Sequence, residues 1–469
     1  MPTTAETIYF NGIDGTSGAY GLAPQSASAI ADLAMHAVTP TNLADLRYRR
    51  ASAATTHLGV REGIDPKNLA AAGWGVVFAH DADPAIAEAL GELLAWRQAQ
   101  AGERFRIFQV RAGERKSLFL ARHGAMPGPV EPDAVPYYLL LVGDPAAIPF
   151  EFQYELDVQY AVGRLQFATL DAYAAYAHSV VQAEQGGAAT VRRASFVGVS
   201  HPGDEATVLS ATCLVEPLAR TLQTRFPDWQ VETILHDAAR KARLHAMLHQ
   251  PHAPALWVAA GHGLEFPLHD ADQRAFQGAL LCADWPGTAA WPRGQRLTPD
   301  YFLSASDLDA TANLHGSIAL LFACYGAGTP QWDEYGVRPG TTRRTLAAQP
   351  FVASLPARML SHPNGGALAV ISHVARSSSY SFGWPGVGAQ TTVFQSCLDR
   401  LLNGYPVGAA VEFFNERWAE LAVMLQELHA ALDANVQVAP EELARLWLAN
   451  ADARGYVVLG DPAVRLPVV

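Results

Sequence analysis

Cysteine is scarce in this chain, and long hydrophobic runs are absent. Only four cysteines occur among 469 residues, without paired spacing. This scarcity indicates free thiols in a reducing compartment rather than a disulfide framework. No stretch holds 18 consecutive apolar residues, so no transmembrane helix is expected. The amino terminus lacks a basic start followed by an apolar segment, so we expect no secretory signal and a cytoplasmic location.

Charged residues are also few, at 17% of the chain, and the net charge is −12. That balance argues against nucleic acid or an anionic membrane surface as a partner. No cofactor is expected, because Gly143 follows a strand pattern but no Gly-Lys-Ser/Thr comes after it. His245 and His249 lie one helical turn apart, but the glutamate of the zinc-peptidase motif is missing. A solvated helix face is therefore favoured over a metal site.

Half of the residues are apolar, as in compact globular proteins, and the chain is too long for a single core. From Trp74 onward, strand patterns alternate with amphipathic helix patterns, which predicts a mostly parallel sheet with right-handed crossovers. We expect two similar α/β lobes, residues 71–187 and 188–469, joined near Gly186-Gly187. Residues 1–70 form an N-terminal segment, which is either an edge of the first lobe or a regulatory segment.

The expected elements follow from hydrophobic periodicity and capping residues. A repeated pattern, Leu139 to Pro145 and Tyr456 to Pro462, agrees with two lobes of similar build. Strands are predicted over 75–79, 105–110, 137–142, 160–165, 194–199, 231–235, 255–260, 318–322 and 367–371. Helices are predicted over 28–37, 83–100, 169–185, 204–225, 238–249, 351–360, 390–402 and 407–432. Thr41 or Asn42 is predicted to cap the start of another helix.

Two strand patterns end in a chemically active residue followed by glycine. Ile318–Phe322 runs into Ala323-Cys324, with glycines at positions 326 and 328, and 255–260 runs into Gly261-His262-Gly263. The carboxyl ends of strands in an α/β sheet are where ligands and catalytic groups gather. We therefore predict that His262 and Cys324 form an imidazole–thiolate pair at the rim of an open cleft.

Such a pair supplies what acyl transfer from a peptide bond requires. A thiolate is the attacking species, and a nearby imidazole lowers the thiol pKa and later delivers a proton to the leaving group. The amides of Gly263 and Cys324 can point at the developing oxyanion. The alternative for any single buried cysteine is an inert core residue. That is our interpretation of the other three, Cys213, Cys282 and Cys397.

The His262-Gly263 and Ala323-Cys324 motifs, each after an apolar strand, resemble the dyad of caspase-like cysteine peptidases, a group that includes bacterial CHAT proteins. The chain most resembles the gingipain-type family within this group. That resemblance rests on further segments between Tyr137 and Pro467: Leu141 to Pro149, Leu156 to Tyr160, Val162 to Leu165 and Leu459 to Pro462.

The resemblance implies a caspase-like three-layer α/β/α sandwich with the dyad in the second lobe. It implies Cys324 as nucleophile and His262 as general acid and base. It also implies that Asp157, before the Val-Gly-Arg strand, contributes to a pocket for a basic P1 side chain. Asp157 as a solvated or capping residue is the alternative, and Asp333 and Glu334 are rival carboxylates. No third residue that orients His262 can be assigned.

We therefore expect a cysteine endopeptidase that cleaves protein or peptide substrates after Arg or Lys. The turn-rich loop from 329 to 350 should be exposed, and Arg343 or Arg344 is a candidate self-processing site. Such an activity would need restraint, so we expect activation by a partner, a ligand or cleavage, and a bacterial defence role is an expectation from resemblance alone. The alternatives are a catalytically silent scaffold of the same fold and a cysteine-dependent acyltransferase or hydrolase of a small substrate.

Overall fold

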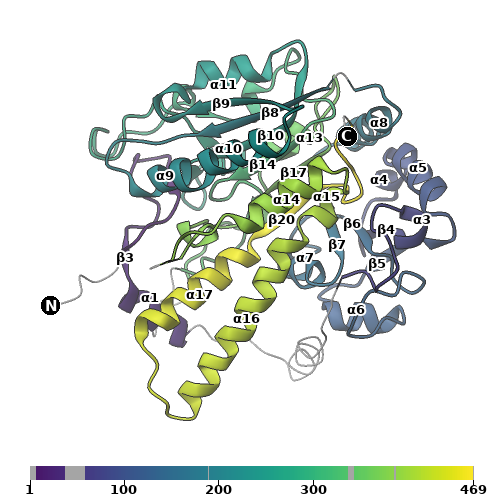
Figure 1. The fold of residues 1–469 in the computed structure, drawn as a ribbon, viewed down its shortest axis with the longest axis horizontal. Helices are drawn as coiled ribbons and strands as arrows, with labels where there is room; N and C mark the ends of the chain where they lie inside the picture. The colour runs from purple at the N-terminus through teal and green to yellow at the C-terminus, as the bar shows by residue number, and fades with distance from the viewer. Residues whose placement is uncertain (1–6, 37–58, 189, 336–342, 385–386, 468–469) are drawn as a thin grey trace.

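One ten-stranded sheet organises the chain in the computed structural model, which describes residues 7–36, 59–188, 190–335, 343–384 and 387–467 (Figure 1). Its helices and strands form a mixed α/β fold around a large, mostly parallel central sheet, as predicted. In spatial order the strands are β5 (Phe105–Val110), β4 (Trp74–Ala79), β6 (Tyr138–Val142), β7 (Ala161–Leu165), β20 (Tyr456–Gly460), β17 (Ala369–His373), β14 (Ile318–Phe322), β10 (Ala253–Ala260), β8 (Thr190–Gly198) and β9 (Gln230–Leu235).

The sheet consists of two parallel halves that run in opposite directions. Strands β5, β4, β6, β7 and β20 run one way, and β17, β14, β10, β8 and β9 run the other. The halves meet where β17 and β20 pair antiparallel, from Ala369 opposite Gly460 to His373 opposite Tyr456. The chain therefore crosses from one half to the other after Gly186-Gly187 and returns for its last strand, β20.

The central strands are buried from end to end because helices cover both faces of the sheet (Figure 1). This burial explains their continuous apolar sequences. Several predicted helices are confirmed within a few residues. These are α1 (Ala27–His36), α8 (Leu170–Glu184), α11 (Lys241–Leu248), α13 (Ser354–Leu360) and α14 (Thr392–Leu402).

Some predicted helices are divided. The helix predicted over 83–100 breaks at Leu90 into α4 (Pro84–Ala89) and α5 (Gly91–Ala101). The one predicted over 204–225 contains a π-helical turn between α9 (Glu205–Leu209) and α10 (Glu216–Arg225). The last predicted helix becomes α15 (Val407–Ala410) and α16 (Glu412–Asp433). The cap predicted at Thr41 or Asn42 lies outside the described residues.

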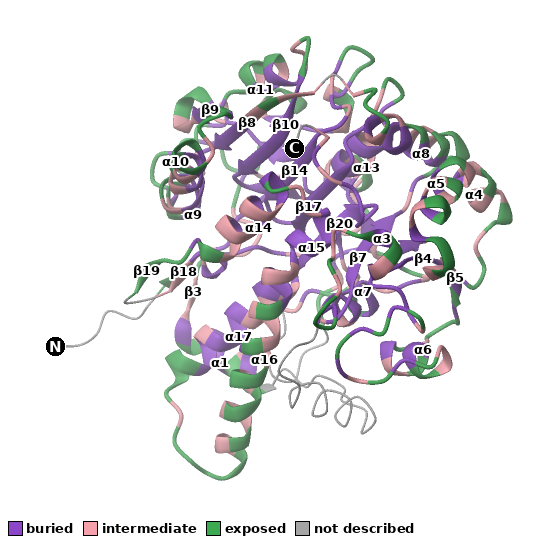
Figure 2. Ribbon diagram, turned by 45° about the vertical axis from the view of Figure 1, so that its right-hand side comes forward, coloured by how far each residue is buried: buried purple, intermediate pink, exposed green. Residues whose placement is uncertain are grey.

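A pair of long helices extends away from the sheet, with the amino-terminal helix beside it (Figure 1). Helix α16 packs along α17 (Pro440–Arg454), which the sequence did not predict, and α17 packs against α1. A separate apolar cluster holds these helices together; its members include Ile8, Phe10, Ile30, Leu443 and Trp447. The far end of α16 is exposed, whereas the sheet is buried (Figure 2). Among the described residues, no helix is both long and apolar enough to cross a bilayer.

A second, four-stranded sheet lies beyond the carboxyl end of β10. Its order is β13 (Phe302–Leu303), β12 (Leu280–Leu281), β11 (Gly263–Glu265) and β2 (Gly12–Asp14). Strand β2 comes from the amino-terminal segment and pairs parallel with β11. Part of the amino-terminal segment therefore lies directly beside the strand that follows His262.

Candidate active site

The two strand ends singled out in the sequence are neighbours. Strands β10 and β14 pair parallel, with Ala260 opposite Phe322, and the Gly261 amide donates to the Phe322 carbonyl at 3.1 Å. Just beyond, Gly263 lies against the Cys324 backbone, and a Cβ added to Gly263 would fall 1.9 Å from the Cys324 carbonyl oxygen. Only glycine fits at position 263, because the backbone approach leaves no room for a side chain.

Cys324 is fully buried at the end of β14. Its Sγ accepts a hydrogen bond from the Ser377 amide at 3.2 Å, and the chain turns sharply after it, with Tyr325 at a φ of 58°. Burial raises the pKa of the Cys324 thiol to about 12, and the positive charge of Arg376 opposes that rise. In this closed form the sulfur is therefore a neutral thiol at neutral pH.

His262 is also fully buried, and one nitrogen of its ring has a strong partner. The Nε2 atom is hydrogen-bonded to Oδ2 of Asp204, which lies in the turn between β8 and α9. The Nδ1 atom is buried and has no hydrogen-bond partner within the described part of the chain. Since Nε2 faces a carboxylate, the neutral ring carries its proton there and leaves Nδ1 as an acceptor.

Sequence reasoning missed Asp204. The available signal was its place: it follows β8, and β8 pairs with β10, the strand that leads to His262. A carboxylate just past a neighbouring strand end can reach the same edge of the sheet. The sequence pattern indicates only the start of a helix at this residue.

The prediction of an open cleft is wrong for this structure, because residues 10–21, here called the amino-terminal cover, lie over the pair. Gly12 runs so close to Cys324 that a Cβ on it would lie 3.4 Å from Sγ. The cover is held on several sides. Asn11 donates its amide to the Ser377 carbonyl at 3.2 Å, Gly15 donates to the Glu265 carbonyl at 2.8 Å, and the Tyr20 hydroxyl donates to Asp204 Oδ1 at 3.1 Å.

The cover also occupies one of the two amides predicted to hold an oxyanion. The Gly263 amide donates to the Asn11 carbonyl at 3.4 Å. Both polar atoms of the buried Asn11 side chain lack a partner among the described residues. A carbonyl from the chain itself thus sits at the amide that a substrate carbonyl would need.

Two buried carboxylates, one of them predicted, bind Arg376, which precedes the residue whose amide donates to Cys324 Sγ. Asp333 and Glu265 both bind the buried Arg376: Glu265 through Nη1 at 2.6 Å and Nη2 at 2.9 Å, and Asp333 through Nη2 at 3.3 Å. Arg344, a predicted processing site, reaches the same pair, at 3.1 Å from Glu265 and 3.7 Å from Asp333. Its side chain is 47% exposed, so two carboxylates face one buried and one accessible guanidinium.

The other predicted pocket residues lie in different surroundings. Asp157 ends α7 (Phe150–Asp157), is buried, and accepts from the Val162 amide at 3.2 Å. Burial raises the pKa of the Asp157 carboxyl well above its ordinary value, which favours a neutral acid. Glu334 pairs with Arg454 instead of facing Cys324. In this closed form neither residue presents an open anionic wall beside the sulfur.

The loop from 329 to 350 is less exposed than expected in its described part, because Asp333 and Leu346 are buried. Arg343 is exposed, as predicted for a processing site, but the Arg344 carbonyl accepts from the Asp333 amide at 2.8 Å. Among the other cysteines, Cys282 and Cys397 are buried, whereas Cys213 is partly accessible in the π-helical turn.

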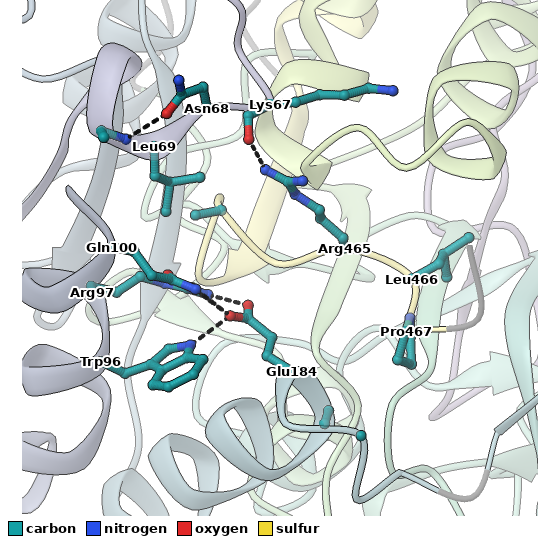
Figure 3. Close-up of a pocket in the computed structure, with 14 residues that line it drawn as sticks. Lys67, Asn68, Leu69, Trp96, Arg97, Gln100, Glu184, Arg465, Leu466 and Pro467 are labelled. Carbon is teal, nitrogen blue, oxygen red and sulfur yellow. Dashed lines mark hydrogen bonds and ion pairs between the residues drawn. The ribbon is translucent and has the colours of Figure 1, made fainter.

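Two cavities lie away from the pair. One of about 610 Å³ is walled by α5, α8 and the chain end, where Trp96, Arg97 and Gln100 meet Glu184 (Figure 3). Another of about 590 Å³ lies between the start of α8 and α13. Neither has His262 or Cys324 in its wall.

His245 and His249 of α11 also group with a third residue. Their ligand atoms and a carboxylate oxygen of Asp309 lie within 4.8 Å of one another. The two imidazole rings stack with centroids 3.7 Å apart, and His249 Nε2 is 3.3 Å from Asp309. Asp309 is exposed, so this cluster lies at the surface.

The chain is similar in part to several known proteins. No curated protein sequence matches the chain. One similar solved structure is a protease, with 15% identity, a TM-score of 0.48, and coverage of 84% of this chain and 78% of that one. Another is the complex of the pro- and mature domains of Porphyromonas gingivalis RgpB, with 12% identity, a TM-score of 0.48, and coverage of 84% of this chain and 80% of that one. The Arg-specific cysteine proteinase gingipain R (RgpB) is also similar, with 12% identity, a TM-score of 0.46, and coverage of 87% of this chain and 80% of that one.

The sequence model of peptidase family C25 matches residues 129–467, a range that contains His262, Cys324 and Asp204. This match spans well over half of the chain. The protein is a cysteine peptidase and belongs to peptidase family C25.

Proposed function

We propose that this chain is a cysteine endopeptidase in which Cys324 is the nucleophile and His262 the general acid and base. The thiolate attacks the scissile carbonyl carbon, and the Gly263 and Cys324 amides hold the oxyanion. His262 then gives a proton to the leaving amine, and the acyl-enzyme forms. Water, deprotonated by His262, attacks the acyl carbon and releases the second product together with the free thiol.

The observation that carries this proposal is the meeting of the two strand ends. The backbone at Gly263 touches the Cys324 carbonyl, and the buried Nδ1 of His262 has no partner among the described residues. A buried nitrogen without a hydrogen-bond partner is costly, so a role for this atom is expected. A nearby nitrogen that can accept a proton is what a thiol nucleophile requires.

We further infer a preference for Arg or Lys at P1, supported by the Glu265 and Asp333 carboxylates. Both bind Arg376, whose charge acts on the Cys324 thiol, and both already bind an accessible guanidinium, that of Arg344. If Arg344 leaves, the pair of carboxylates keeps only Arg376 as its counter-charge. A substrate Arg or Lys would then restore the balance through charge-assisted hydrogen bonds.

The amino-terminal cover provides the restraint that such an activity needs. It fills the space over Sγ and holds the Gly263 amide, so a substrate carbonyl cannot reach either. We infer that a partner, a ligand or cleavage releases the cover and activates the enzyme. A cytoplasmic location, supported by four free cysteines, is part of the proposal.

The test is a cleavage profile on a peptide library, run with wild type and Cys324→Ala. We expect cleavage after Arg and Lys by wild type and none by Cys324→Ala. Selective labelling of Cys324 by an arginyl chloromethylketone would support the same assignment. A catalytically silent scaffold predicts neither result, and a hydrolase of small substrates predicts turnover of small esters without cleavage of arginyl peptides. Cleavage that survives in Cys324→Ala would overturn the proposed nucleophile.

A further inference from the structure

We propose that His245, His249 and Asp309 form a binding site for a divalent transition-metal ion, with Zn²⁺ as the ion that fits best. Among the described residues, they are the one group of at least three such side chains that can share a cation. The histidine pair alone favours a solvated helix face, but the fold adds a third donor from 60 residues further along the chain. The site is separate from the proposed peptidase function, and its test needs no catalytic activity.

The ring of His249 carries the first argument. Its Nδ1 lies 2.7 Å from the His245 carbonyl oxygen, which can only accept, so the ring proton is on Nδ1. The lone pair of the neutral ring is then on Nε2, and Nε2 faces Oδ1 of Asp309 at 3.3 Å. Two acceptors thus face each other. A cation between them removes this conflict, as does a second proton on the ring.

The position of His245 favours a metal ion over a second proton. Its ring stacks on that of His249, with centroids 3.7 Å apart and an interplanar angle of 14°. A proton shared with Asp309 needs no further ligand, whereas a metal ion needs several, and the stacked ring offers one more nitrogen. Two protonated rings in this stack would repel each other, but one metal ion uses the lone pairs of both.

The donor set and the spacing fit zinc. Zinc binds imidazole nitrogen at about 2.0–2.1 Å and carboxylate oxygen at about 2.0–2.2 Å, so tetrahedral geometry places two such ligands roughly 3.4 Å apart. The 3.3 Å between His249 Nε2 and Asp309 Oδ1 matches this separation. All three ligand atoms lie within 4.8 Å of one another, so a small turn of the partly exposed His245 side chain completes the set. Mg²⁺ and Ca²⁺ prefer oxygen ligands, and two imidazoles disfavour both.

Asp309 is held in place by its neighbours, although its side chain is exposed. Its Oδ1 accepts from the Thr311 amide at 2.7 Å and from the Thr311 hydroxyl at 2.6 Å. Its carbonyl is hydrogen-bonded to Nε2 of the buried His362 at 2.7 Å. The Asn313 amide donates to the Leu248 carbonyl at 2.7 Å, which ties this segment to the end of α11. Support of this kind fixes the orientation of a ligand before the metal binds.

The site lies at the opposite end of β10 from the His262–Cys324 pair. His249 precedes the first residue of β10 by four positions, and His262 follows its last residue by two. The strand has eight residues, which span roughly 26 Å. A zinc ion at this site therefore does not contact the pair. It links α11 to the segment that leads into β14, closes a loop of 60 residues and so stabilises the fold.

Zinc binding to the full-length Cys324→Ala chain, stripped of metal, tests the proposal. This parent chain lacks the thiol of the proposed nucleophile, which would compete as a ligand. Calorimetry with Zn²⁺ alone should show a site that Asp309→Asn weakens by at least about tenfold. The Asn side chain keeps an oxygen for the Thr311 hydrogen bonds, so the turn is preserved. His249→Gln should weaken the same site by a similar factor.

His178→Gln is the matched control. His178 and Glu92 form an exposed histidine–carboxylate pair at 3.2 Å, to which no third ligand is added among the described residues. This variant should bind Zn²⁺ as tightly as the parent. Zn²⁺ should also raise the melting temperature of the parent and of His178→Gln but not that of Asp309→Asn, and Mg²⁺ should raise none of the three. A parent that binds no Zn²⁺, undiminished binding by Asp309→Asn, or equal weakening by His178→Gln would each overturn the site.

Discussion

Gly12 passes directly over Cys324, with space for no more than a methyl group between its backbone and the sulfur. A Cβ at Gly12 would lie 3.4 Å from Sγ and 3.6 Å from the Cys324 Cβ. The same strand pairs with β11, whose first residue, Gly263, carries a predicted oxyanion amide. A segment near the start of the chain thus lies where a substrate would have to bind, and release of this segment becomes the first experimental question.

Cutting the chain after the amino-terminal cover should activate the protein. Ala23 and Pro24 are exposed, so a recognition site for an added sequence-specific protease can be inserted between them. Cleavage there should let the cover leave and increase hydrolysis of arginyl reporters at least tenfold. The same site inserted at the exposed Ala112-Gly113 turn is the control, because cutting there leaves the cover attached. Equal activity before and after the first cut, with the cover shown to have dissociated, would contradict an inhibitory role.

Release should also change how Cys324 responds to pH. In the covered form burial raises the thiol pKa to about 12, so alkylation by iodoacetamide should be slow at pH 7 and rise steadily toward high pH. After release, pairing with imidazolium should make alkylation nearly independent of pH from about pH 7 upward. Cys282 is the internal control, because burial likewise raises its pKa to about 12 and it lies outside the pair.

Peptide-resolved mass spectrometry would follow both thiols in one sample. If alkylation of Cys324 stays parallel to that of Cys282 after release, the proposed dyad is excluded.

The raised pKa of Cys324 also makes the free energy of unfolding depend on pH. The folded protein keeps a proton that the thiol of the unfolded chain loses. The stabilisation from this proton is complete below the ordinary thiol pKa and is lost as pH rises toward 12. The covered chain should therefore be less stable at pH 10 than at pH 8.

Substitution of the paired carboxylates should alter P1 preference. Glu265→Gln and Asp333→Asn should each lower the ratio of kcat/KM on arginyl to that on methionyl reporters by about 10- to 100-fold. The ratio cancels any loss of folded protein. Glu334→Gln is the matched control, since Glu334 pairs with Arg454. Asp157→Asn tests the pocket residue implied by resemblance, and a drop confined to that variant would assign the pocket to Asp157.

The sequence predicted the sheet well because the strands are buried on both faces and therefore read as continuous apolar runs. The two strand ends carrying His262 and Cys324 were found for the same reason, together with their adjacent glycines. The reversal of direction between β17 and β20 was not predictable, since pairing between distant strands leaves no local pattern. Helix α17 was missed because its apolar residues partly contact α16 and α1 rather than a sheet.

The missed parts of the site depend on contacts between residues far apart in the sequence. Asp204 is 58 residues from His262, and Glu265 is 111 residues from Arg376. Gly12 shows no sign in the sequence that it approaches Cys324. Such pairs can be recognised only when the strand order is known. In the sequence alone, their carboxylates look like those of ordinary surface residues.

Self-processing in the loop after Cys324 should occur after Arg343 rather than after Arg344. The Arg344 carbonyl is held by the Asp333 amide, and its guanidinium by Glu265, so the peptide bond that follows Arg344 is less available than the one that follows the exposed Arg343. Wild type and Cys324→Ala should be incubated side by side after release of the cover, and new amino termini read by mass spectrometry. We expect a fragment beginning at Arg344 from wild type only, and none from Arg343→Gln. Equal fragmentation of the two proteins, or an intact loop in active wild type, would show that this enzyme does not cut itself there.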